Sequence, residues 1–308
     1  MFFAKKRIGV ELSQAGIAFS QVAGRGGGQY LEKVAYRALP ENVLLPAYKK
    51  LNVTDADVFV NKLKEAHCLL TVDSKRISVS LPDTAGKVIL LEMDEQIKSR
   101  AEGREIVAWK IKKKTLFDIA DAHLDYQILK QNEDGVFSIM VTMVSRDVIT
   151  QYEDLFGAAG FSLARIDLNA FNLCTLIARA VDEPVDQTLL YMYGNALGIM
   201  IFKGGIPEFV RFKEISDKKS LQEQLHLEIK HSLLAYRGIS TSVLNSRFLS
   251  LAPPEISQQF VRIVEETTGC KPILIDPSDY LNISSAIPTN INNFFLHAAS
   301  AGAALREF

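Results

Sequence analysis

The residue types that perform most enzyme chemistry are scattered along this sequence. Its five histidines form no HExxH pair and no cluster with carboxylates, so metal-assisted hydrolysis has little support. His226 and His231 stand five apart on an expected helix and are interpreted as surface residues. No serine or cysteine stands in a nucleophile elbow. The sequence therefore predicts neither catalytic residues nor a metal site.

A glycine-rich run, Gly24 to Gly28, is the one stretch that invites a phosphate-binding interpretation. A Walker loop needs a Lys-Ser/Thr pair followed by a helix, whereas here the pattern that follows is a strand. We interpret the run as a hairpin turn.

Size and composition are those of a globular protein with room for two domains. The chain has 308 residues, of which 48% are hydrophobic and 23% charged. Thirty-five basic residues against 36 acidic ones give a net charge of −1, so no overall field attracts nucleic acid. Cys68, Cys174 and Cys270 are odd in number and far apart, which is typical of buried thiols rather than of a disulfide framework or zinc site. We expect no nucleic-acid partner and no small-molecule substrate.

The N-terminal run Met1 to Arg7 is too short in its apolar part for a signal peptide, and no later run reaches the length of a membrane span. These features predict a cytoplasmic protein.

Hydrophobic periodicity predicts an alternation of strands and helices along the whole chain. Strands are expected at 8–12, 16–22, 30–38, 76–81, 87–91, 123–129, 136–144, 161–168, 188–193, 197–202, 206–212, 248–251 and 272–275. Helices are expected at 57–70, 94–114, 146–159, 169–180, 217–237, 255–268 and 292–305. The fold class is therefore α/β.

The stretch from Asp94 to Leu129 carries the most information. It opens with acids and ends its helical part with lysines, the charge order that a helix macrodipole favours. The period then changes to two, so that Leu124, Tyr126 and Ile128 are expected on one side of a strand, and His123, Asp125 and Gln127 on the other.

This stretch resembles the PilM family, the actin-like cytoplasmic proteins of type IV pilus machines. The resemblance rests on Trp109 near the end of a helix, on Phe117 and Ile119, and on the strand Leu-Asp-Tyr-Gln-Ile-Leu at 124–129. A departure is Lys114 to Asp118, where the family usually has a proline-bearing run.

The resemblance implies a two-lobed, actin-like (ribonuclease H-like) ATPase fold with an inserted strand-helix-strand-strand subdomain. Three-strand meanders at 8–38 and 188–212 agree, because both lobes of such a fold begin alike. The expected first lobe is 1–81 with 164–183, the inserted subdomain is 82–163, and the second lobe is 184–308. The second lobe is expected to lack most of its usual insert.

The resemblance also implies where a nucleotide would bind, and the expected residues are altered there. Glu11 stands where the family has an acid, but Leu12 and Ser13 replace the glycine that follows, and Ala18 stands where a lysine is common. Larger side chains keep backbone amides away from phosphate.

The second hairpin is altered further. Tyr191 stands in place of a carboxylate and Tyr193 in place of a glycine, with Gly194 and Asn195 next. At the adenosine turn, Leu251 to Pro254 replace a glycine run. A tyrosine cannot coordinate Mg²⁺ as aspartate does. The prediction is a pseudo-ATPase without cofactor, whose degenerate site would comprise Glu11, Ser13, Gly194 and Asn195; Mg-ATP binding is the alternative.

Two functions from different classes follow from these observations. The first is a cytoplasmic scaffold, peripheral at the inner membrane, in a type IV pilus or related type II secretion platform. It would dock the tail of a PilN-like membrane protein through Trp109, Phe117 and Leu124. A pilus motor ATPase and a second copy of the chain are further candidate partners. The second function is an ATP-binding, actin-like ATPase that polymerises or acts as a switch, with a sugar kinase as a third, weaker option.

Overall fold

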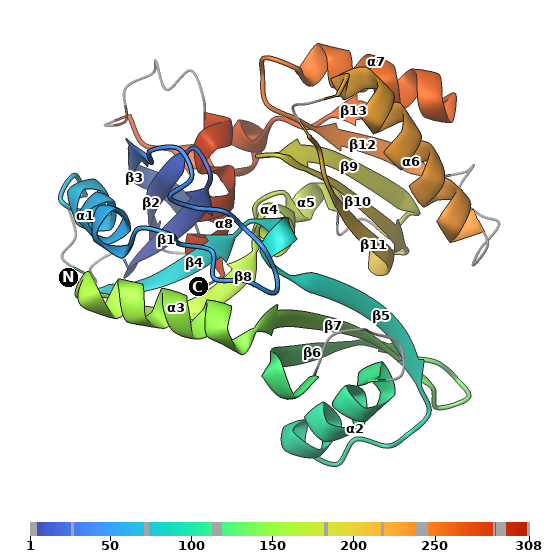
Figure 1. The fold of residues 1–308 in the computed structure, drawn as a ribbon. Helices are drawn as coiled ribbons and strands as arrows, with labels where there is room; N and C mark the ends of the chain where they lie inside the picture. The colour runs from blue at the N-terminus through green and yellow to red at the C-terminus, as the bar shows by residue number, and fades with distance from the viewer. Residues whose placement is uncertain are drawn as a thin grey trace.

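Three separate β-sheets form within the described part of the chain (Figure 1). The computed structural model describes residues 5–25, 28–70, 74–112, 119–181, 184–216, 219–237, 246–285, 287 and 294–306. The first sheet has the strand order β14-β3-β2-β1-β4-β8, made by β1 (Lys5–Ser13), β2 (Gly16–Arg25), β3 (Gly28–Ala38), β4 (Arg76–Leu81), β8 (Ser162–Leu168) and β14 (Asn282–Ile283). One face of this sheet is covered by α1 (Ala56–His67) and α3 (Arg146–Ala158), whose apolar residues join its core.

The second sheet repeats the opening meander of the first. Its order is β11-β10-β9-β12-β13, made by β9 (Gln187–Tyr193), β10 (Ala196–Lys203), β11 (Ile206–Glu214), β12 (Arg247–Leu251) and β13 (Ile273–Leu274). Helices α6 (Leu221–Arg237) and α7 (Ser257–Thr268) pack on its outer face. A short connection joins β11 to α6, so this lobe carries no insert there.

The third sheet, β5-β7-β6, belongs to the insert and is built from β5 (Lys87–Met93), β6 (Ala122–Gln131) and β7 (Phe137–Ser145). Helix α2 (Arg100–Lys112) covers one face, and Val107 and Ile111 pack there against Ile139 and Val141. Alternate residues of β7 therefore face α2 and the opposite side of the sheet. The strand-helix-strand-strand order is confirmed.

The layer between the first and second sheets is helical. It contains α4 (Asn169–Leu176), which continues into the short α5 (Ala178–Val181), and α8 (Ala298–Leu305). Small residues let α8 approach closely: a Cβ at Gly9 would lie 1.9 Å from the carbonyl O of Ser300, and one at Gly302 would lie 1.9 Å from that of Asn172. One apolar cluster runs through this layer and includes residues of both lobes.

Two expected domain boundaries need correction. The range 82–163 for the insert includes α3, but Tyr152 and Phe156 of that helix are buried in the core of the first lobe. The range 184–308 for the second lobe includes β14, which pairs with β3, and α8, which packs against β1. The chain therefore returns to the first lobe at its C-terminal end.

The helix expected at 94–114 begins later, at Arg100. Ser99 Oγ accepts a hydrogen bond from the backbone N–H of Glu102, and Glu102 Oε2 accepts one from the N–H of Lys98. This arrangement resembles a capping box. Glu95 lies before the helix and forms an ion pair with Lys110 at 2.6 Å, so it is stabilised by a side chain of α2 rather than by a place in its first turn.

Candidate functional site

The first site is the junction between the lobes, where Tyr193 meets Glu11. The Tyr193 hydroxyl on β9 donates to Glu11 Oε2 on β1 at 2.6 Å, lies 3.1 Å from the carbonyl O of Phe295, and accepts from the N–H of Ala299 at 3.2 Å. The Tyr193 and Phe295 rings pack with centroids 4.9 Å apart. Both partners are buried, so this contact joins a strand of each lobe away from water.

A second contact of the same kind lies beside the first. The hydroxyl of Tyr191, two residues earlier on β9, donates to Asp83 Oδ2 at 2.7 Å. Asp83 begins the short 3-10 helix that follows β4, and its Oδ1 accepts from the N–H of Ala170 at 2.8 Å. Asp83 therefore ties the start of α4 to the second lobe. Gly198 on β10 leaves the room for this ring, because a Cβ there would lie 2.0 Å from Tyr191 Cζ.

Burial sets the protonation of these two acids. It raises the pKa of Glu11 to about 8 from an ordinary 4.5, against the lowering effect of hydrogen bonds from Tyr193 and the backbone of Ser300. It likewise raises the pKa of Asp83 to about 6. Glu11 is therefore mostly protonated at pH 7, and the pKa of each tyrosine is held well above its usual range.

The other residues expected at the nucleotide site lie at turns and do not reach across the junction in the hydrogen bonds that follow. Ser13 Oγ accepts from the N–H of Gly16 at 3.1 Å and donates to its carbonyl O at 3.0 Å. Gly194 has a φ of +56° in the β9–β10 turn, and Asn195 Nδ2 donates to Glu214 Oε1 at 3.1 Å. The structure thus links Glu11 to the second lobe through Tyr193, whereas the hydrogen bonds of Ser13 and Asn195 stay within their own lobes.

The chemistry available at the junction is limited. Glu11, the acid that the sequence assigned to the site, is mostly protonated at neutral pH and accepts a hydrogen bond from a tyrosine hydroxyl. No group of three or more His, Cys, Asp or Glu side chains among the described residues is arranged to hold a metal ion. Asp83 was missed by sequence reasoning, because its position opposite Tyr191 depends on how the lobes pack.

The second site is a groove of about 670 Å³ between the insert and the two lobes. The face of the insert sheet that α2 leaves open forms one wall, and β8 with α4 forms another. The β10–β11 hairpin of the second lobe forms the third. Apolar residues that line it are Leu81, Leu129, Met140, Val144, Ile149, Ile166, Leu168, Phe171, Val181, Met200, Phe202 and Pro207.

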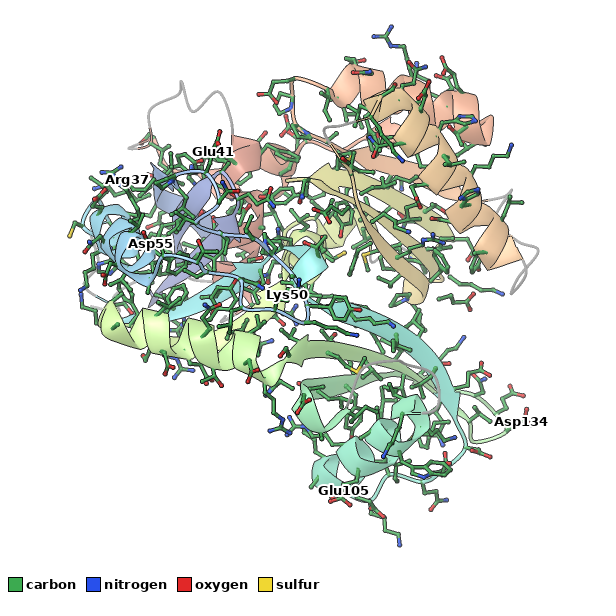
Figure 2. All side chains as sticks on the ribbon, in the orientation of Figure 1. Arg37, Glu41, Lys50, Asp55, Glu105 and Asp134 are labelled. Atoms are coloured by element: carbon green, nitrogen blue, oxygen red, sulfur yellow. The ribbon has the colours of Figure 1, made fainter. Side chains whose placement is uncertain are left out.

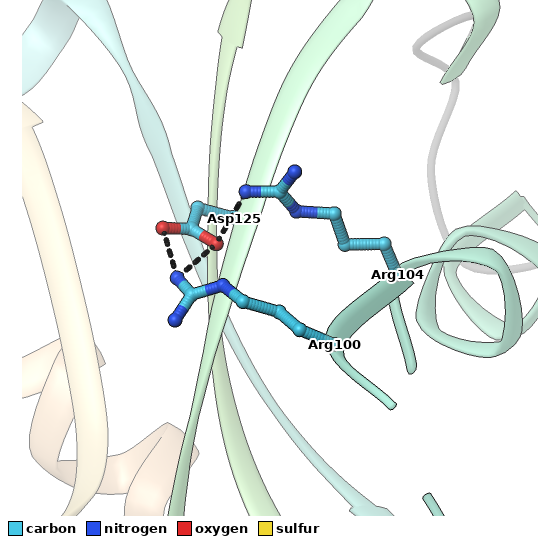
Figure 3. A network of polar contacts seen from close by, with 3 residues as sticks. All are labelled: Arg100, Arg104 and Asp125. Carbon is cyan, nitrogen blue, oxygen red and sulfur yellow. Dashed lines mark hydrogen bonds and ion pairs between the residues drawn. The ribbon is translucent and has the colours of Figure 1, made fainter. Parts of the chain in front are cut away.

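Charged side chains form two clusters along the groove. In the first, Arg100 Nη2 donates to both carboxylate oxygens of Asp125 at 2.8 Å, and Arg104 Nη2 donates to Oδ1 at 3.3 Å (Figure 3). Partial burial raises the pKa of Asp125, but the hydrogen bonds from the arginines outweigh it, so the pKa is lowered overall. All three side chains are about half exposed or more.

The second cluster surrounds Asp167 on β8. Its Oδ2 lies 3.4 Å from Arg306 Nε and 3.8 Å from Arg165 Nε, in ion pairs too long or poorly aligned for good hydrogen bonds. Burial raises the pKa of Asp167, against the lowering effect of Arg306 and Arg165. Each cluster has two arginines for one aspartate, so each carries a net positive charge.

Two of the three residues expected to bind a partner, Trp109 and Leu124, lie away from this groove. Trp109 is 58% exposed on α2 and is absent from the groove lining, and Leu124 packs in the insert core on the α2 side of the sheet. Phe117 lies outside the described residues. The expected alternation along β6 is observed, but the groove lies on the side of His123, Asp125 and Gln127.

The fold and the junction define this chain as a two-lobed, actin-like α/β protein with an inserted subdomain. No protein-family profile matches the sequence, and no curated protein matches it either. One chain of the solved PilM-PilN type IV pilus biogenesis complex has the same fold, with a TM-score of 0.81, 17% identity and coverage of 97% of this chain and 98% of that chain. A Bacteroides thetaiotaomicron protein with an actin-like ATPase fold and unknown function matches at a TM-score of 0.51, 12% identity, and coverage of 90% and 92%.

Within the part of the chain that the structure describes, no helix is both long and apolar enough to cross a membrane.

Proposed function

We propose that this protein is a scaffold of a type IV pilus or related secretion platform, held at the cytoplasmic side of the inner membrane by the tail of a PilN-like membrane protein. The observation that carries the proposal is the likeness, over nearly the whole length of both chains, to a chain of the PilM-PilN complex. The binding site would be the groove between the insert and the lobes.

The groove suits an extended, largely apolar tail. Such a segment needs pockets for alternate side chains and backbone partners along its length. The apolar lining offers the pockets. Strands β6 and β8 are edge strands of their sheets, and edge strands present backbone groups to an added strand. The two arginine clusters would then fix the orientation of the tail through its polar groups.

Nucleotide is not required in this proposal. The support is that the side chains of Tyr191 and Tyr193 fill the junction. Tyr191 donates a hydrogen bond to Asp83, and Tyr193 donates one to Glu11. A phosphate group would have to displace these contacts, and its charge would have to be desolvated in a buried junction.

The test is titration calorimetry with a synthetic peptide carrying the cytoplasmic tail of the PilN protein encoded in the same genome. Thr142 lies on the groove wall, so Thr142→Arg should fill the groove and lower affinity at least about tenfold, or 1.4 kcal/mol. Glu105 is exposed on the outer face of α2 (Figure 2), and Glu105→Arg in the same subdomain should leave affinity unchanged.

Equal binding by wild type and Thr142→Arg would move the tail to another surface, and Trp109→Ala would then test the exposed face of α2. Mg-ATP titrated into the same protein should release no heat. Micromolar Mg-ATP affinity would instead favour the actin-like ATPase.

A further inference from the structure

The two tyrosines of β9 project to the same side of their strand, because they are two residues apart. Each reaches a different element of the first lobe: Tyr193 reaches β1 at Glu11, and Tyr191 reaches the turn after β4 at Asp83. Two contacts at separate points on the first lobe restrict rotation between the lobes, as a single contact would not.

Both contacts lie in the apolar cluster that the lobes share. Tyr191 and Tyr193 are 1% and 4% exposed, and Glu11 and Asp83 are 5% and 1% exposed. A buried hydroxyl that loses its acceptor has no water to replace it, so opening the lobes would leave both tyrosine hydroxyls, Glu11 Oε2 and Asp83 Oδ2 without their interlobe partners until water entered. The closed arrangement is therefore favoured without any bound ligand.

The packing around the rings fits this arrangement closely. Gly198 leaves space that the Tyr191 ring fills, since a Cβ at that position would overlap the ring. On the other side, Phe295 packs against the ring of Tyr193, and the first turn of α8 donates the Ala299 N–H to its hydroxyl. The C-terminal helix thus contributes to the same contact.

We propose that Tyr191 and Tyr193 form an interlobe latch, which holds the two lobes in one closed arrangement in place of a bound nucleotide. The latch also fixes the third wall of the groove, because Met200 and Phe202 on the neighbouring strand β10 line it. That consequence rests on the proposed function, whereas the latch itself does not.

The experiment measures the distance between the lobes without any tail peptide. Spin labels are attached at Asn61→Cys on α1 and Gln259→Cys on α7, two exposed positions, in a background with the native cysteines replaced by serine. Pulsed dipolar spectroscopy then compares wild type with the Tyr191→Phe/Tyr193→Phe double variant. The double variant keeps both rings and loses both hydroxyls.

Tyr152→Phe is the matched control. Its hydroxyl is also fully buried and donates to Asn52 Oδ1 at 3.0 Å, but both residues belong to the first lobe. The latch predicts one narrow distance distribution for wild type and Tyr152→Phe, and a broader distribution shifted to longer distance for the double variant.

An unchanged distribution in the double variant would overturn the proposal, and so would equal broadening in Tyr152→Phe. If the double variant does not fold, Tyr193→Phe alone is measured and must broaden the distribution. Loss of peptide binding with an intact latch would count against the proposed function only.

Discussion

The lobe junction and the groove each hold two carboxyl groups, but in opposite surroundings. At the junction, Glu11 and Asp83 are buried and accept from tyrosine hydroxyls. In the groove, Asp125 and Asp167 are more accessible and pair with arginines. A neutral donor suits a buried and permanent contact because no charge has to be desolvated, whereas arginine donors in contact with solvent can exchange partners. The first arrangement suits a structural contact, and the second suits recognition.

The largest expected effect comes from Gly198→Ala, a substitution that overpacks the junction. Gly198→Ala would bring a Cβ within 2.0 Å of the Tyr191 ring and force it from its place, so we expect a loss of roughly 1–3 kcal/mol or more in the free energy of unfolding. Urea denaturation measures this.

Gly157→Ala is the control for that experiment. Gly157 lies in α3 with nothing within 4 Å of an added Cβ, so alanine should be neutral or stabilising by about 0.5–1 kcal/mol. Equal stability of wild type and Gly198→Ala would mean that the ring is not held where the junction needs it.

The second expected effect is a dependence of the free energy of unfolding on pH, which arises from the buried acids of the junction. The folded-state pKa of Glu11 is raised to about 8, so its stabilising contribution is full below its ordinary 4.5 and is lost as pH rises through 8. His297 acts in the opposite sense, because its pKa is lowered to about 4 and its contribution is lost only as pH falls below 6.5. The pKa of Asp83 is raised to about 6, so its stabilising contribution is already mostly lost by pH 6.5. Between pH 6.5 and 8, Glu11 therefore dominates among these three buried groups.

We expect the free energy of unfolding to fall by on the order of 1 kcal/mol between pH 6.5 and 8 in wild type. Glu11→Gln keeps an acceptor for Tyr193 but cannot titrate, so its stability should be flat over that range. Denaturation midpoints at several pH values would decide, and a wild type as flat as the variant would contradict a neutral Glu11.

Sequence patterns predicted most of the strands and helices, but not β14 and not which surfaces meet. Tyr191 and Tyr193 were found by comparison with a family pattern, whereas Asp83 had no signal because only the packing of the lobes brings it to Tyr191. The start of α2 could have been found, since Ser99 and Glu102 have the spacing of a capping box.

The C-terminal helix and the groove show the limit of local patterns. The small residues of α8 predicted a helix, but its place against β1 depends on the close approach at Gly9 and Gly302. On β6 the alternation was predicted correctly, but the open face is set by α2, which covers the side of Leu124. Local periodicity therefore gives the two faces of a strand without saying which one a neighbouring element covers.

The smallest expected effect is that of removing an arginine from the groove, and it tests whether the ion pairs there stabilise the fold. Arg100 and Asp125 are 67% and 47% exposed, so their ion pair is screened by water and salt. Arg100→Ala should change the free energy of unfolding by less than about 1 kcal/mol, and by less still at high salt. Glu105→Ala on the outer face of α2 should change it hardly at all. If Arg100→Ala instead cost as much as Gly198→Ala at every salt concentration, the arginine cluster would be a structural element like the junction, and its donors would not be available to a docked tail.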